Sequence, residues 1–286
     1  RMWASIAGNG VNVLFDFVFI FGWGPIPAMG ATGAALATVL GLTTMCVMYA
    51  WRFRHVVGRP SRPTREVLRS TIEIGLPAGA QAGLGSLAFA TMTAVLAKVG
   101  SAHLAASQIA LNVISVSFLP GYGLGEAAGV LASRYLGAGK PRTAARAIKS
   151  ARGIALVVMG LCGVVFWLAG AAIVGVFTTD HNVQVIAESL LLCAALFQLL
   201  DAIVMVNLCA LRNLGDTRFT FFATAIAAWL IMLPLTYFLG IRMGFGATGA
   251  WCGMIFEMAL LALLTGRRVA GVRTGRVGRL DLLLGR

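Results

Sequence analysis

The chain has 286 residues, of which 59% are hydrophobic and only 12% are charged, and its mean hydropathy is +0.87. Soluble proteins average about 25% charged residues, and one soluble core cannot cover this much apolar surface. The composition therefore excludes a soluble domain and indicates a chain solvated by a lipid bilayer.

Eight apolar segments are long enough to cross a membrane, for which a helix needs roughly 20 residues. In chain order they are 3–24, 30–51, 70–97, 103–133, 152–177, 184–211, 218–239 and 245–266. Their apolar runs are continuous, whereas the strands of a membrane barrel alternate apolar and polar residues. We therefore expect an all-α membrane protein of about eight transmembrane helices.

The net charge of +13 is gathered in alternate loops. Of the 23 Lys and Arg residues, all but Lys98 and Arg242 lie at residue 1, in 52–69, 134–152 or 212–218, or after residue 266. This alternation is the positive-inside pattern, and it argues against nucleic-acid binding. It predicts a multi-pass protein of the plasma (inner) membrane with both ends of the chain in the cytoplasm.

The cysteines and histidines show no pattern for a metal or a catalytic centre. All five Cys residues fall inside predicted spans without a CxxC pair, and the three His residues lie in loops or at span ends. We expect the Cys residues to be packing groups. No metal-ligand spacing or nucleophile–base pair is present, so the sequence predicts neither an enzyme nor a cofactor.

A short repeat relates the two ends of the chain. Residues 30–34 and 246–250 both read Gly-Ala-Thr-Gly-Ala, each after an aromatic-rich span and before a span that ends in Arg residues. Parallel repeats of this kind occur in transporters. They predict a hairpin (1–54) that closes an N-terminal lobe, a basic loop (55–69), a complete six-helix C-lobe (70–266) and a basic tail (267–286). We expect a twelve-helix, two-lobe protein, with four spans before residue 1.

Four acidic residues lie deep inside predicted spans: Asp16, Glu126, Asp201 and Glu257. A carboxylate at that depth is tolerated only when it is protonated, ion-bound or hydrated, which makes it a functional candidate. A hydrogen bond between helices is the structural alternative for each one. Glu257 has no polar neighbour at helical spacing, so we expect it to matter least.

Polar partners accompany the other three acids, because residues three or four apart share a helix face. Asn12 precedes Asp16, Tyr122 precedes Glu126, and Gln198 precedes Asp201. The candidate cavity-lining residues are Glu126, Gln198, Gln108, Asn112, Tyr122 and Gln81.

These motifs, in this order, resemble the multidrug and toxic compound extrusion (MATE) transporters over almost the whole chain. The matching runs are Asn12–Asp16, Gly30–Thr38, Gly75–Ala78, Ala105–Ala110, Gly123–Ala128, Tyr135–Lys140, Phe197–Ala202 and Leu211–Arg218. The resemblance implies two six-helix lobes that export cationic or amphipathic compounds against an inward flow of protons or sodium.

The resemblance also implies cation-coupling residues. Asn12, Asp16 and Thr38 match an N-lobe cation site, whose remaining Asp lies on a first helix that this chain does not contain. Asp201 matches the Asp of a C-lobe site. The Glu that accompanies it in the family falls near Gly85 or Ser86, where no acid is present. Glu126 is a candidate for the missing charge.

Two readings compete for the function. The first is a secondary antiporter for drugs or toxic metabolites, monomeric when complete. The alternative is a lipid-linked saccharide flippase of related fold, which needs cationic residues in its cavity to hold a phosphate. The sequence has no base deep in a span, which favours cationic or neutral substrates. A channel could also use acidic rings, but the lobe repeat favours alternating access.

Overall fold

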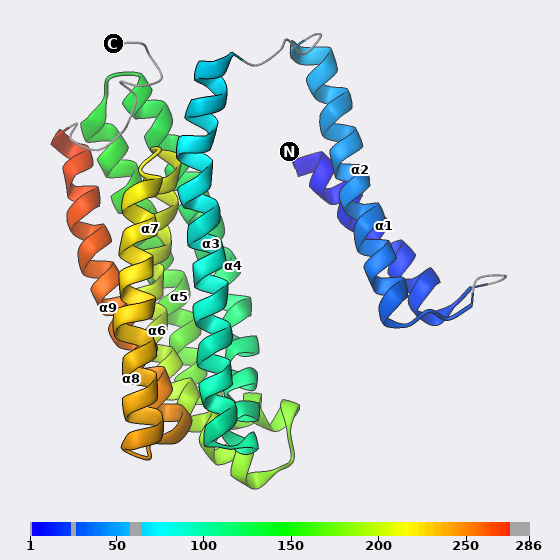
Figure 1. Cartoon of the computed structure of the whole chain (residues 1–286), viewed down its shortest axis with the longest axis vertical. Helices are drawn as coiled ribbons and strands as arrows, with labels where there is room; N and C mark the ends of the chain where they lie inside the picture. Colours follow the sequence, from blue (N-terminus) through cyan, green and yellow to red (C-terminus); the bar gives the residue numbers. More distant parts are fainter. Residues whose placement is uncertain (1, 24–26, 58–63, 275–286) are drawn as a thin grey trace. The chain divides into compact units, whose positions relative to one another are not determined.

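The computed structural model describes residues 2–23, 27–57 and 64–274. Every element of regular structure within these ranges is helical, and eight helical segments are long and apolar enough to cross a membrane (Figure 1). The elements are α1 (Met2–Phe21), α2 (Ala31–Val57), α3 (Arg65–Val99), α4 (Ser101–Gly137), α5 (Pro141–Phe177), α6 (His181–Asn213), α7 (Thr217–Ile226), η1 (Ala227–Met232), α8 (Leu233–Tyr237), η2 (Phe238–Arg242), α9 (Gly246–Ala270) and η3 (Gly271–Thr274). The expected all-α chain with about eight spans is confirmed.

The chain divides into two compact units, Arg1–Val67 and Leu68–Arg286. The division lies within the segment 55–69 that was predicted to be a loop, although α2 and α3 extend into that segment from either side. The start of the predicted tail is helical, because it forms the end of α9 and then η3, and residues 275–286 lie outside the described residues.

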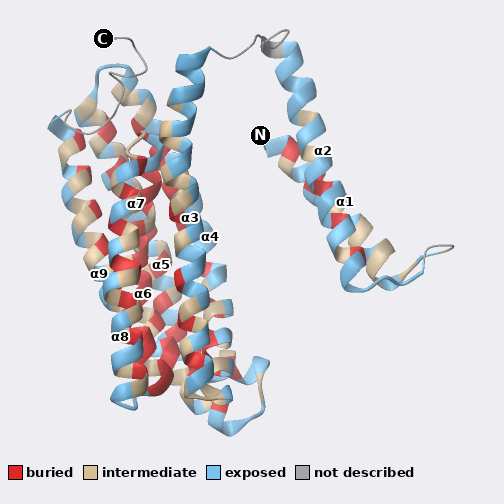
Figure 2. Cartoon of the chain, viewed as in Figure 1, coloured by how far each residue is buried: buried red, intermediate tan, exposed pale blue. Residues whose placement is uncertain are grey.

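The first unit is the hairpin of α1 and α2, and small residues let its two backbones approach. A Cβ atom at Gly33 would lie 2.5 Å from the Phe19 carbonyl oxygen, and one at Gly41 would lie 3.0 Å from the Cβ of Asn12. Close backbone approach through small residues is the usual way in which membrane helices pack. Most large side chains of this unit are exposed within it (Figure 2).

The core of the second unit is built around α6, which packs against α4, α5 and α9. Figure 2 shows the buried residues gathered on the inward faces of these helices. Polar contacts also join the helices: the Trp251 indole donates to Ser107 Oγ at 2.8 Å, and Asn207 Nδ2 donates to Thr265 Oγ1 at 3.2 Å. These bonds satisfy donors in the core, although Asn207 Oδ1 is buried without a partner among the described residues.

The fifth span begins earlier than the apolar pattern indicated. The basic stretch after Pro141 runs into the span as one helix of 37 residues, with Pro141 in its first turn. Proline suits that position because the first backbone N–H groups of a helix have no internal partner. Ala144 and Ile148 are buried, so the basic stretch packs against the bundle along one side.

The seventh span is interrupted by two π-helical segments, η1 and η2, on either side of the short helix α8. Pro234 lies in the first turn of α8, directly after η1. A proline cannot donate a backbone hydrogen bond, and π segments often mark functional sites. The π segment η1 contributes residues to the cavity described below.

The sequence repeat has a counterpart in backbone geometry. Gly30 and Gly246 both have positive φ, at 54° and 60°. Three residues later, Gly33 and Gly249 each lie where a Cβ atom would clash with the backbone of the preceding helix. The two Gly-Ala-Thr-Gly-Ala blocks therefore perform the same turn-and-packing role in their two hairpins.

Candidate transport site

A cavity of about 720 Å³ lies within the second unit, between α3, α4, α6, α9 and the α7–η1 span. No backbone of the unit approaches α3 closely along an extended contact, which leaves room beside it. Gly85 of α3 lines the cavity, and a Cβ atom there would meet nothing within 4 Å. The walls are mostly apolar, with aromatic and methionine side chains from several helices.

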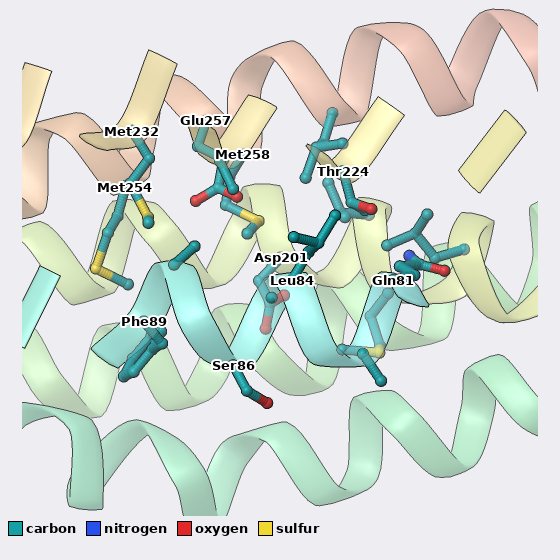
Figure 3. Close-up of a pocket in the computed structure, with 18 of the residues that line it drawn as sticks. Gln81, Leu84, Ser86, Phe89, Asp201, Thr224, Met232, Met254, Glu257 and Met258 are labelled. Atoms are coloured by element: carbon teal, nitrogen blue, oxygen red, sulfur yellow. The ribbon is translucent and has the colours of Figure 1, made fainter. Parts of the chain in front are cut away.

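Two carboxylates line this cavity, Asp201 of α6 and Glu257 of α9, and Figure 3 shows both in its middle part. Their residues are only 6% and 8% exposed. Among the described residues neither carboxylate has a hydrogen bond or an ion pair. These two charges therefore face the cavity without compensation from the protein.

Two further polar groups of the cavity lack partners. Gln81 of α3 is 7% exposed, and its Oε1 atom is buried without a hydrogen-bond donor in the described structure. The indole Nε1 of Trp229, in η1, is likewise buried and has no acceptor there. An acceptor and a donor thus accompany the two carboxylates.

Arg212 is the only basic residue among the described residues that line the cavity, and it is exposed. It lies eleven positions after Asp201 on the same helix, which corresponds to about 16 Å along the axis. The middle of the cavity therefore keeps its negative character.

The predicted N-lobe residues lie in the first unit. Asn12 and Asp16 are half-buried on α1, and Asn12 packs against Gly41. Thr38 is exposed, and its hydroxyl donates to the carbonyl of Ala34 at 2.9 Å. Asp16 has no hydrogen bond or ion pair to any residue that the structure describes.

Of the six predicted cavity-lining residues, all in the second unit, only one lines the cavity. Gln81 lines the cavity, whereas the other five are not among its lining residues. Glu126 Oε2 accepts from Asn213 Nδ2 at 3.4 Å, and Gln198 is fully buried and donates to Ser117 Oγ. The remaining three, Gln108, Asn112 and Tyr122, are exposed within the unit.

Glu257 was expected to matter least of the four deep acids, yet it lines the cavity, and Trp229 was not among the predicted residues. The repeat could have pointed to Glu257, because the register that matches Gly30 to Gly246 also matches Gly41 to Glu257. Gly41 faces the first helix of its hairpin, so Glu257 should face the first helix of the last hairpin. No comparable sequence signal marks Trp229.

Within the described ranges, no group of three or more His, Cys, Asp or Glu residues is arranged to hold a metal ion. The cavity instead combines a large apolar volume with a few charges in a membrane-spanning bundle. That combination suits the passage of small molecules better than a chemical reaction.

The sequence model of the MatE family matches residues 77–238, more than half of the chain. The chain belongs to the MATE family. MATE proteins are multi-pass membrane transporters and not enzymes. The matched region includes the lining residues of four of the five segments around the cavity, and only those of α9 lie outside it.

Curated relatives in this family are multidrug resistance proteins. The chain is 35% identical over 274 residues to the multidrug resistance protein NorM of Burkholderia vietnamiensis, covering 92% of this chain and 59% of that protein. It is 30% identical over 272 residues to the probable multidrug resistance protein NorM of Pseudomonas aeruginosa, covering 91% and 56%. The chain thus spans less than two thirds of the length of these relatives.

Solved MATE structures share the fold. A MATE protein in its straight conformation superposes with a TM-score of 0.83 at 20% identity, covering 96% of this chain and 63% of the other. An outward-facing multidrug resistance MATE transporter of the MOP superfamily gives 0.82 at 20% identity, covering 95% and 62%. At 20% identity this similarity shows only that the chains share a fold.

Proposed function

We propose that this MATE protein is a secondary antiporter that exports drugs or toxic organic compounds, many of them cationic, in exchange for protons or sodium. The observation that carries the proposal is the apolar cavity with two uncompensated carboxylates, Asp201 and Glu257, inside a membrane-spanning unit. The relatives named as multidrug resistance proteins support the same function. No cofactor is needed, because the ion gradient supplies the free energy.

The proposed coupling site is Asp16, with Asn12 and Thr38 as neutral oxygen partners, and Asp201 is a second acidic site. A carboxylate at membrane depth is stable only when protonated, ion-bound or hydrated, so its occupancy can bias which side of the transporter opens. A ligand shifts that equilibrium only when its affinity differs between the two states. A half-buried carboxylate without a hydrogen bond or ion pair to any described residue, as Asp16 is within its unit, is free to meet this requirement.

The flippase alternative is disfavoured by the charge of the cavity. A lipid-linked saccharide carries phosphate, which is held best by Arg and Lys side chains. The two buried acids would repel such a group, and the single base that lines the cavity, among the residues described, is exposed Arg212. The cavity therefore favours cationic or neutral substrates.

The working environment is proposed to be the plasma (inner) membrane, with both ends of this chain in the cytoplasm and the protein as a monomer. The partners are the lipid bilayer and small amphipathic or cationic molecules. Nucleic acid is not a partner, since the basic residues are spread over alternate loops in the positive-inside pattern.

The test is gradient-driven drug efflux from membrane vesicles that contain the protein. Asp16→Asn keeps the volume and much of the hydrogen bonding of the side chain while removing its charge. We expect it to stop efflux under an imposed proton or sodium gradient and to leave expression and membrane insertion unchanged. Asp201→Asn should weaken efflux less.

Each variant is compared at equal amounts of inserted protein. Imposing the proton gradient and the sodium gradient in separate vesicle preparations identifies the coupling ion. Normal efflux by Asp16→Asn together with lost efflux by Asp201→Asn would move the coupling site out of the first hairpin. The absence of gradient-driven efflux by the unmodified protein would reject antiport altogether.

A further inference from the structure

The size of the cavity indicates what it can hold. At about 720 Å³ it falls within the range of roughly 300–1,000 Å³ that is typical of sites for drug-sized molecules. A single inorganic ion needs only a few converging oxygens. The cavity is thus shaped for an organic molecule.

Its walls suit a lipophilic ligand with variable shape. Four methionines line it, Met205, Met232, Met254 and Met258, together with aromatic side chains that include Trp229. Methionine side chains are flexible and polarisable, so they adapt to different apolar shapes, as in proteins that bind many partners. An indole ring also attracts cations over its face.

The polar groups of the cavity determine which charge a ligand there can carry. Two carboxylates, Asp201 and Glu257, face the cavity without partners in the described structure, and the unpaired Oε1 of Gln81 adds a third acceptor. Buried charges without partners are costly, so each is expected to meet an opposite charge when the site is occupied. The geometry excludes an anion and favours a cation that carries hydrogen-bond donors.

We propose that Glu257 of α9 is a substrate-binding carboxylate of this cavity, and that it acts together with Asp201 of α6 on the cationic compounds of the proposed function. The inference rests on the proposed export of cations and adds the residue that sets charge selectivity. Because the two acids come from different helices and face one cavity (Figure 3), a molecule with two positive charges can pair with both. Glu257 therefore favours dications over monocations.

The experiment measures equilibrium binding to the purified chain of 286 residues in lipid nanodiscs, without any ion gradient. The probes are ethidium, which has one positive charge, and propidium, which has the same ring system and two. Their fluorescence reports binding. We expect Glu257→Gln to weaken ethidium binding about tenfold or more, because the variant removes a desolvated counter-charge, and to weaken propidium binding further.

Two variants control for indirect effects. Glu257→Asp keeps the charge and should retain most of the affinity. Glu188→Gln removes a carboxylate from the same helix as Asp201 but outside the lining residues, and should leave binding unchanged. Loss of affinity in Glu257→Gln that is not regained by Glu257→Asp would mean that the residue acts through folding, and would overturn the proposal.

Unchanged affinities in Glu257→Gln, equal losses for both probes, or no binding by the unmodified chain would also overturn it. The inference and the proposed antiport can fail separately. Efflux by the protein without binding of these probes to the chain leaves antiport standing and rejects the cavity. Binding that depends on Glu257, without gradient-driven efflux, supports the binding cavity and rejects antiport.

Discussion

The unpaired Oε1 of Gln81 and Nε1 of Trp229 are unusual for atoms that are buried. Leaving a buried polar group without a partner costs about 1–3 kcal/mol, and the large majority of buried side-chain polar atoms in proteins are satisfied. Both atoms lie on residues that line the cavity with Asp201 and Glu257. Binding of a ligand that donates to Gln81 Oε1 and accepts from Trp229 Nε1 would recover this free energy.

The open space at Gly85 allows a rescue experiment. Gly85 lines the cavity, and a side chain there would begin in empty space, so an acid can be placed on α3 in place of the one on α9. We expect Gly85→Glu to restore much of the ethidium affinity lost in Glu257→Gln, because the cavity regains its second negative charge. Binding to the double variant in nanodiscs measures this.

Gly85→Gln in the same background is the matched control, since it has the same size without the charge. Equal rescue by Gln and Glu would mean that filling the space, and not the charge, governs affinity.

The residues of the site were predictable to different degrees. Asp201 was predictable from the sequence because it lies deep in an apolar span. A carboxylate is costly at that depth, which makes it a functional candidate. Gln198 was expected to share its face, but three positions on a helix differ by about 60° in direction, and Gln198 pairs with Ser117 of α4 instead. Trp229 lies in the π segment η1 and lines the cavity, and no local sequence pattern marks that segment.

At the scale of elements, seven of the eight predicted spans begin within a few residues of the start of a helix in the structure, and the fifth is the exception. Most helices also continue beyond them, as α3 does to Arg65 at its start, because a helix does not end where the hydrocarbon ends. Hydropathy marks only the apolar part of a membrane helix. The fifth helix therefore exceeds its predicted span by its whole basic first part, from Pro141.

The repeated glycine turn before α9 can be tested by comparison with its counterpart before α2. Gly246→Ala places a Cβ atom against the ring of His103 and leaves an alanine at a positive φ. The His103 ring also accepts the N–H of Ala247 through Nδ1 at 3.2 Å. We expect a clear fall in the thermal unfolding midpoint. Circular dichroism of the purified chain measures it.

Gly30→Ala is the matched control for this prediction. Gly30 has nearly the same φ, but a Cβ atom there meets nothing within 4 Å, so only the backbone strain of about 1–2 kcal/mol applies. An equal fall in both variants would show that the contact with His103 has no part in the effect.

At the scale of the whole molecule, charge and topology agree. Successive spans run in opposite directions, so the basic ends of α4, α6 and α9 and the basic starts of α3, α5 and α7 belong to one side of the membrane. Ion pairs lie at this end of the second unit, including Arg268 with Asp216 at 2.6 Å. Lys98 and Arg242 belong to the other side. This arrangement is the positive-inside pattern applied to the folded unit.

The proposed orientation predicts which loops can be labelled from outside the cell. In a variant without the five native cysteines, Thr179→Cys places a thiol in the exposed loop between α5 and α6, and Ala138→Cys places one in the exposed loop between α4 and α5. Consecutive loops lie on opposite sides of the membrane, and the proposed orientation puts the basic loop around Ala138 in the cytoplasm. A membrane-impermeant maleimide should therefore label Thr179→Cys on intact cells, and Ala138→Cys only after permeabilisation. Labelling both after permeabilisation controls for reactivity, and the reverse pattern on intact cells would invert the proposed orientation of every span.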